Sequence, residues 1–237
     1  MAYVISKHRQ RVNVELDTVK TKLQCADDPS ISSDLRDYAI AAAIFLAHAE
    51  FENYFVDALD GVANTYSHAA PDTSKLPAAL RSHLISEKLG LNSVAIKIVA
   101  RTGEHEVLQC IDKWFSSPDS VLLTGAQPLN HFGGEHIYGD YRYPSIKNIE
   151  RVLRRIGVGD PKGVLNRQLR RDVIALLESI AGLRTALAHS ATLPGVSILD
   201  VLARIDGLKH FIEALDRVLY LQVKSTLLDA DWQSNMC

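Results

Sequence analysis

Apolar residues recur every three or four positions along most of the chain. This spacing places them on one face of an α-helix. In residues 4–25 the pattern predicts a first amphipathic helix, whose inner side carries Val12, Leu16, Val19 and Leu23. Residues 27–30 interrupt the pattern, and Ser32 or Ser33 can cap a second helix over residues 34–66. This second segment is rich in alanine and densely apolar, which indicates the centre of a helical bundle.

The middle of the chain is less regular. Shorter helices are predicted over residues 78–89, 92–101 and 104–115. Proline and glycine accumulate in residues 116–143, which predicts a long loop. A loop of this length in a compact domain usually has a functional role or is mobile.

Helical periodicity returns in the last third of the chain. One helix is predicted over residues 145–156, and Asp160 followed by Pro161 predicts the start of the next. Its apolar face continues to His189, so we expect one helix from Pro161 to that point, and a last helix over residues 197–228. No β-alternation or internal repeat is visible. The prediction is an all-α bundle, formed by residues 1–237 as one domain with an insertion at about 67–143.

Composition narrows the class of protein. The hydrophobic fraction is 47% and the net charge is −2, as in ordinary globular proteins. The three cysteines Cys25, Cys110 and Cys237 are too scattered for a disulfide framework or a thiolate metal site. We expect a cytoplasmic protein with no cofactor and no bound metal. Residues 38–49 form the most apolar stretch, which is shorter than the about 20 residues that span a bilayer, and no signal peptide is expected.

Positive charge is concentrated in residues 142–171, which contain nine lysines and arginines against two acidic residues. Such a segment suits an RNA-binding surface, because phosphate groups attract guanidinium and ammonium groups. The candidate RNA-binding residues are Arg151, Arg154, Arg155, Arg167, Arg170 and Arg171. A solvated helix face paired with acidic residues elsewhere is an equal alternative.

Arg184 and His189 are the strongest catalytic candidates, near the end of a long helical segment. Arginine is a permanent cation that binds phosphate oxygens, and histidine can transfer a proton near neutral pH. Five residues along a helix give a rise of roughly 7.5 Å and a rotation of roughly 140°. The long arginine side chain can compensate for that separation, so both groups can reach one cleft.

Other polar residues offer weaker alternatives. Glu50 and Glu52 lie on the apolar second helix, where a buried carboxylate needs a partner. Glu50 can orient Arg184 or His189, with a surface position or salt bridge as an equal alternative. For Glu52 a surface position or salt bridge is favoured. His48 and His83 fit helical patterns and are expected to have hydrogen-bond partners in the bundle. The loop also contains residue types that suit a metal site, although their spacing matches no motif: His131, Glu135, His136 and Asp140.

Three blocks of sequence resemble a known superfamily. Residues 182–190 (GLRTALAHS) resemble the Arg-x4-6-His signature of HEPN proteins. Residues 47–54 (AHAEFENY) are similar to the long early helix of the HEPN group named after RiboL-PSP proteins and its MAE-type relatives. Residues 143–157 (YPSIKNIERVLRRIG) are similar to the block that precedes the motif helix in that group. The blocks follow the family's order and span about residues 34–220.

The resemblance implies a HEPN-like helical bundle that forms a homodimer and cleaves RNA without a metal, leaving a 2′,3′-cyclic phosphate. It assigns Arg184 and His189 to the two signature positions. It also implies a toxin–antitoxin or phage-defence setting, with an antitoxin or defence-system partner protein. Thr185 departs from the amide, acid or histidine that often follows the arginine, and remains an auxiliary candidate with Glu50. Ala191 replaces a tyrosine that is typical of nucleotidyltransferase-partnered HEPN toxins.

Two other function classes remain open beside this endoribonuclease hypothesis. A HEPN-like module without catalysis could bind RNA or a partner protein. A metal-dependent hydrolase could use His131 and His136. RNA cleavage that resists a chelator and is lost in His189→Ala would support the endoribonuclease. Absence of cleavage would support the non-catalytic module, and activity abolished by the chelator would support the metal-dependent hydrolase.

Overall fold

The computed structural model describes residues 3–70, 72–88, 108–109, 120, 122, 125, 132–170, 172–189 and 195–237. Every regular element within these ranges is helical, as the all-α prediction requires. Among these described residues, no helix has both the length and the hydropathy needed to cross a membrane.

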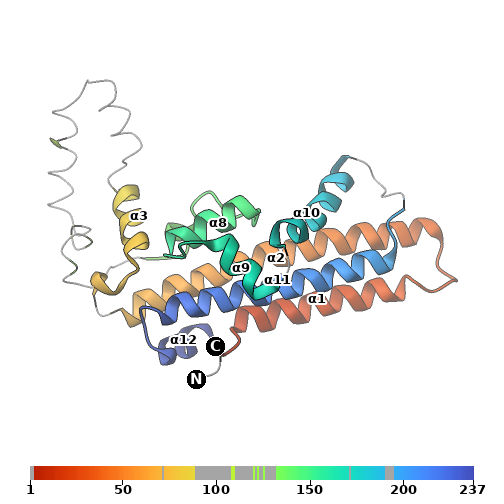
Figure 1. Cartoon of the computed structure of the whole chain (residues 1–237). Helices are drawn as coiled ribbons and strands as arrows, with labels where there is room; N and C mark the ends of the chain where they lie inside the picture. Colours follow the sequence, from red (N-terminus) through yellow and green to blue (C-terminus); the bar gives the residue numbers. More distant parts are fainter. Residues whose placement is uncertain are drawn as a thin grey trace.

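Three long helices form the body of the molecule and lie side by side (Figure 1). They are α1 (Lys7–Cys25), α2 (Ser33–Ala69) and α11 (Ile198–Lys224). A fourth helix, α12 (Asp229–Met236), packs on α2 and α11 at the end where the two chain termini meet. The core between these helices contains fully buried aromatic rings, and Phe51 of α2 meets Phe211 of α11 edge to face.

Shorter helices cover one side of this body. They are α3 (Ala78–Lys88), α7 (Glu135–Tyr138), α8 (Ile146–Arg155), α9 (Pro161–Leu169) and α10 (Val173–His189), and a single 3-10 turn η1 (Thr73–Lys75) precedes α3. Helix α10 packs against both α2 and α11, while α9 packs mainly on α11. The Arg184/His189 helix is therefore supported by two of the long helices.

Serine caps begin four of these helices. Ser6, Ser32, Ser145 and Ser197 each accept a hydrogen bond from the backbone N–H three residues later. Such caps satisfy backbone donors that have no partner inside the helix. The expected cap at Ser32 and the helix start at Asp160 and Pro161 are both confirmed.

The predicted single helix from Pro161 to His189 is wrong, because the chain breaks between α9 and α10. Arg170 ends α9 with a φ of 54° in the left-handed region, and α10 begins at Val173. Left-handed residues terminate helices, and glycine is the usual choice there. An arginine at this position gives no sequence signal for a break. Because the apolar spacing is helical on both sides of it, the pattern predicted one continuous helix.

Other boundaries also differ from the predictions. The first helix begins at Lys7 rather than at residue 4, and the last one ends at Lys224 before α12 begins. The predicted loop over residues 116–143 contains the short helix α7. The helices predicted over residues 92–101 and 104–115 lie outside the described residues, apart from 108–109.

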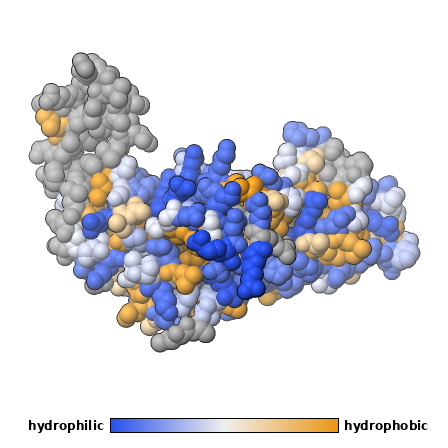
Figure 2. All heavy atoms as spheres, in the orientation of Figure 1, coloured by the Kyte–Doolittle hydropathy of each residue, from blue (hydrophilic) through white to orange (hydrophobic). Residues whose placement is uncertain are grey.

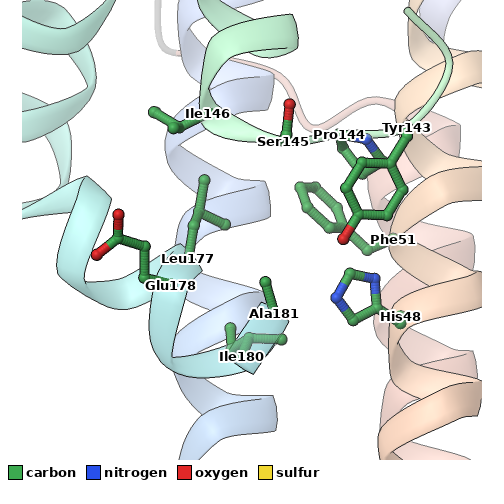
Figure 3. A pocket seen from close by; sticks show the side chains of 10 residues that line it. All are labelled: His48, Phe51, Tyr143, Pro144, Ser145, Ile146, Leu177, Glu178, Ile180 and Ala181. Carbon is green, nitrogen blue, oxygen red and sulfur yellow. The ribbon is translucent and has the colours of Figure 1, made fainter. Parts of the chain in front are cut away.

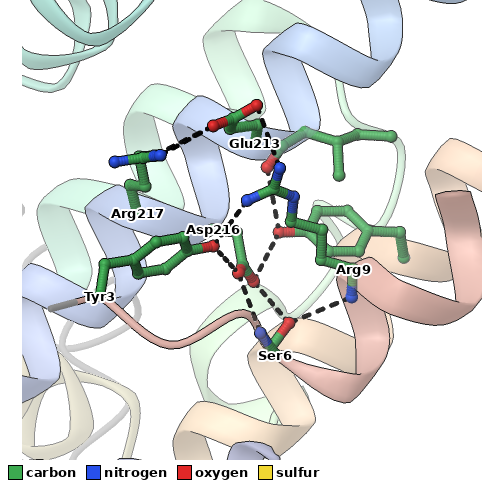
Figure 4. Close-up of polar contacts among 8 residues, drawn as sticks. Tyr3, Ser6, Arg9, Glu213, Asp216 and Arg217 are labelled. Atoms are coloured by element: carbon green, nitrogen blue, oxygen red, sulfur yellow. Dashed lines mark hydrogen bonds and ion pairs between the residues drawn. The ribbon is translucent and has the colours of Figure 1, made fainter.

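A buried carboxylate ties the start of the chain to α11 (Figure 4). Asp216 is completely buried and accepts hydrogen bonds from Tyr3, from Ser6 and from Tyr54. The Ser6 Oγ–Asp216 Oδ1 distance is 2.6 Å. Burial and the nearby Asp216 charge raise the pKa of Tyr54, so it stays a hydrogen-bond donor. This network fixes the N-terminal segment across two of the long helices.

Candidate functional site

Arg184 lies at the edge of the contact between α10 and α2. The apolar face of α10 buries Leu177, Ile180 and Leu187, and this leaves the Arg184 side chain 40% exposed. Its Nη2 atom is 3.7 Å from Oε1 of Glu52 on α2. The guanidinium carbon also lies 5.2 Å from the centre of the Tyr143 ring, which is a cation–π contact. Two neighbours therefore orient the guanidinium, while part of it stays accessible.

His189 is the last residue of α10 and is exposed. It follows Arg184 by five residues, so the two groups occupy different faces of the helix, as the spacing predicts. The structure shows no direct contact between them. Both side chains are nonetheless accessible, which is the condition that a substrate-binding role requires.

The two auxiliary candidates take different positions. Thr185 is exposed, and its hydroxyl donates to the carbonyl oxygen of Ala181 at 3.0 Å, a bond within its own helix. Glu50 is half-buried on α2, but Glu52 is the carboxylate that contacts Arg184. Two residues along a helix change direction by about 200°. Glu52, and not Glu50, is therefore the carboxylate that contacts Arg184, in agreement with the salt bridge favoured for Glu52.

His48 differs most from its sequence-based expectation. The ring is 4% exposed, and neither ring nitrogen has a hydrogen-bond partner. It stacks on Tyr143 with ring centres 5.8 Å apart and planes 8° apart. Burial, together with the nearby Arg184 cation, lowers the pKa of His48 to about 4. The ring is therefore neutral at pH 7, and the prediction of a satisfied histidine is wrong.

The corresponding prediction for His83 is confirmed, since its Nε2 atom lies 3.0 Å from the carbonyl oxygen of His136. No sequence signal separates His48 from His83, because each precedes a glutamate by four residues on its helix, Glu52 for His48 and Glu87 for His83. In the structure the His48 Nδ1–Glu52 Oε1 distance is 3.9 Å, beyond hydrogen-bond range.

A pocket opens beside this cluster (Figure 3). It has a volume of about 130 Å³ and lies between α2, α10 and residues 143–146. Its walls are mainly apolar, including Phe51, Ile146 and Leu177, with the rings of His48 and Tyr143 on one side. A dry cavity of comparable size can hold a six-membered aromatic ring.

The predicted RNA-binding arginines of α8 differ in their exposure and in their contacts with other residues. Arg154 is exposed, with only a 4.0 Å approach to Glu150. Arg151 is exposed and stacks over Tyr141 at 4.9 Å. Arg155 is half-buried, stacks over the same ring and donates to the carbonyl oxygen of Ile137 at 2.6 Å. This hydrogen bond links α8 to α7, and burial lowers the pKa of Arg155.

The remaining candidates lie at the end of α9. Arg167 and Arg170 are exposed and make no ion pair within the described part of the chain. Arg171 lies outside the described residues. Figure 2 shows strongly hydrophilic side chains over the middle of the molecule, where α8 and α9 lie.

The alternative metal site falls partly outside the described residues, because His131 is not among them. Of the others, His136 accepts a hydrogen bond from the Gly133 backbone at Nδ1 and lies 3.3 Å from Glu135. Across the described ranges, no group of three or more His, Cys, Asp or Glu residues is arranged to hold a metal ion.

One family model matches the chain. It is described as RiboL-PSP-HEPN and covers residues 11–220, which include all of α2 and most of α1 and α11. Comparison with curated proteins and with solved structures gives no significant match. The match extends over well over half of the sequence and agrees with the helical architecture. The chain therefore belongs to the RiboL-PSP-HEPN family.

Proposed function

We propose that this protein is a metal-independent endoribonuclease of HEPN type, with Arg184 and His189 as its catalytic residues. The ribose 2′-oxygen attacks the adjacent phosphorus, the bond to the 5′-oxygen breaks, and a 2′,3′-cyclic phosphate and a 5′-hydroxyl result. His189 takes the proton from the 2′-hydroxyl or gives one to the leaving oxygen. Arg184 binds a non-bridging oxygen and stabilises the charge that develops there.

The observation that carries this proposal is the placement of Arg184. A cation that is fixed on two sides and open on the third can receive a phosphate without a large loss of side-chain freedom. Glu52 and Tyr143 fix it, and 40% of its side chain remains accessible. HEPN membership supports nuclease activity in general, since the matched region includes this helix.

The pocket beside Arg184 supports the same function. A phosphate on Arg184 would place the neighbouring base near the rings of Tyr143 and His48. Stacking of a base on an aromatic side chain contributes about 1–3 kcal/mol and tolerates different bases. The pocket then orients the nucleotide, while Arg151 and Arg154 attract the strand from α8.

We also propose a homodimer in which two copies of the site face one shared cleft. Helix α2 exposes the large apolar residues Leu35, Tyr38, Phe45 and Leu46. Their spacing places them on one face of the helix, and Glu52 follows Phe45 by two turns on that face. Figure 2 shows apolar surface at this end of the molecule. A second copy on this stripe would bring its own site close to Arg184.

The setting follows from the family alone. We propose that the enzyme acts in the cytoplasm in a toxin–antitoxin or phage-defence system, with an antitoxin or defence protein as its partner. Such a partner would keep the nuclease inactive until it is needed.

A second function is favoured by one specific contact. Glu52 already offers a negative charge to Arg184, and this lowers the net attraction for a phosphate. A HEPN-like module that binds RNA or a protein without cleaving it is the alternative.

The two functions are separated by a cleavage assay in EDTA with wild type, Arg184→Ala and His189→Ala. We expect chelator-resistant cleavage that falls by about 10²–10⁴ in each variant. His68→Ala, which removes an exposed histidine from the last turn of α2, is the matched control and should cleave as wild type does. RNA binding without cleavage by any of the four proteins would favour the non-catalytic module.

A further inference from the structure

A second cavity lies between α9 and α11, and the proposed cleavage reaction does not use it. Its volume is about 480 Å³, and its lining is mainly polar. The charged and polar groups come from both helices: Arg167 and Arg170 from α9, and His210, Glu213 and Arg217 from α11.

The charges in this cavity are unbalanced. Three guanidinium groups face a single carboxylate, that of Glu213, which leaves an excess of two positive charges. Arg217 is paired with Glu213 at 2.9 Å, whereas Arg167 and Arg170 form no ion pair among the described residues. Like charges that line one cavity repel, so an anion bound there would offset their repulsion.

Polar contacts tie the α11 wall of the cavity to α1 and to the N-terminal segment (Figure 4). Glu213 also pairs with Arg9 of α1 at 3.0 Å, so one carboxylate holds two arginines. Arg217 lies over the Tyr3 ring at 4.7 Å, and the Tyr3 hydroxyl donates to the buried Asp216. A guanidinium held in this way loses little conformational freedom when a ligand binds.

The α9 wall contains the one unusual backbone feature among the described residues. Arg170 is the only residue other than glycine with a positive φ there, 54°. Left-handed geometry is costly for side chains with a Cβ, and glycine would avoid the cost. Strained positions of this kind are often found at functional sites. Arg170 lines the cavity from this left-handed position, so its backbone conformation sets the direction in which its side chain leaves α9.

We propose that this cavity binds a phosphate group with about two or more negative charges, either a terminal phosphate or a diphosphate. Its excess of two positive charges matches a dianion better than the single charge of an internal phosphodiester. Arginine forks also match the oxygen geometry of phosphate. The ligand can be the 5′-phosphate of an RNA or the phosphates of a free nucleotide. The proposal does not depend on RNA cleavage by Arg184 and His189.

Inorganic pyrophosphate is the first probe, titrated into the full-length protein by calorimetry. We expect saturable binding that weakens at least tenfold in Arg170→Gly and in Arg167→Ala. Lys162→Ala removes an exposed cation from the same helix outside the cavity, so its dissociation constant should stay within about twofold of wild type. No binding by wild type, or equal binding by all four proteins, would overturn the proposal.

Arg170→Gly also separates ligand binding from folding. Glycine relieves the left-handed strain, so the melting temperature should rise by roughly 2–4 °C while pyrophosphate binding weakens. A variant that melts lower and binds normally would contradict the proposed role of Arg170. His189→Ala should bind pyrophosphate as wild type does, which keeps this test independent of cleavage.

The source of the phosphate is identified by competition. Two RNAs of one sequence, with a 5′-phosphate or a 5′-hydroxyl, are compared with a nucleoside diphosphate for displacement of pyrophosphate. At least tenfold stronger displacement by the 5′-phosphorylated RNA identifies an RNA end as the ligand. Displacement by the nucleotide, with equal weak effects of both RNAs, identifies a free nucleotide. Displacement by neither ligand class would refute the cavity as a phosphate site for nucleotides or RNA ends.

Discussion

At the scale of a single residue, His48 is a polar side chain whose burial lowers the stability of the folded protein. Both ring nitrogens are buried without partners beside Arg184. An unsatisfied buried polar group costs about 1–3 kcal/mol, so a plain apolar residue would stabilise the bundle more. The ring lines the pocket next to Arg184, where the proposed stacking of a base would use it.

The lowered pKa of His48 makes stability depend on pH. The folded-state pKa of about 4 lies below the unfolded value of 6.5, so only the unfolded chain takes up a proton between these values. Stability is therefore full above about pH 6.5 and decreases as the pH falls toward 4. In His48→Phe we expect the free energy of unfolding to fall less over this pH range than in wild type, by on the order of 2 kcal/mol.

Urea unfolding at about pH 7 and about pH 4.5 measures this difference. His8 and His83 also have lowered pKa values because they are buried, so the comparison with wild type is essential. His68→Ala, at an exposed position, should retain the wild-type decrease. An identical decrease in His48→Phe and wild type would contradict the neutral buried ring.

At the scale of elements, the periodicity of apolar residues predicted where the long helices lie. A helix that buries one face has apolar residues every three or four positions, so the sequence alone shows this pattern. It missed the break at Arg170, since left-handed geometry depends on how α9 and α10 pack on α11 and not on a glycine. It also selected Glu50 over Glu52. The rotation of α2 relative to α10 decides which carboxylate meets Arg184, and a sequence does not specify that rotation.

The contact between α2 and α10 is tested by Glu52→Gln. The pair is partly exposed, and such pairs contribute about 0.2–1 kcal/mol. Removing the carboxylate charge frees Arg184 for phosphate, so we expect RNA to bind about two- to fivefold more tightly. The cleavage rate of bound RNA should decrease, because the guanidinium loses one of its two supports. Single-turnover kinetics separate the two effects.

Glu50→Gln is the matched control, because Glu50 lies on the same helix without contacting Arg184. It should change neither the RNA affinity nor the cleavage rate. Weaker RNA binding in Glu52→Gln would show that Glu52 does not compete with phosphate for Arg184.

At the scale of the whole molecule, the exposed apolar stripe on α2 is the feature that a single chain leaves unexplained. Large exposed apolar patches often mark interaction surfaces. The proposed dimer covers this stripe and brings two catalytic pairs together. Phe45→Glu introduces a charge into it, and we expect the mass in solution to change from dimer to monomer and RNA cleavage to be lost.

Light scattering after size exclusion measures that mass. Val14→Glu changes an exposed apolar residue on α1 and should leave the dimer intact. A wild-type monomer that still cleaves RNA would contradict the shared cleft.

The chemical identity of the cleavage product distinguishes attack by the ribose 2′-hydroxyl from attack by water. In EDTA we expect RNA fragments that end in a 2′,3′-cyclic phosphate and begin with a 5′-hydroxyl, as measured by mass spectrometry. His189→Ala should yield none of them, and a single 2′-deoxy nucleotide at the cut position should block cleavage there. Fragments with a 5′-phosphate, or cleavage that requires a divalent metal, would contradict attack by the 2′-hydroxyl at Arg184 and His189.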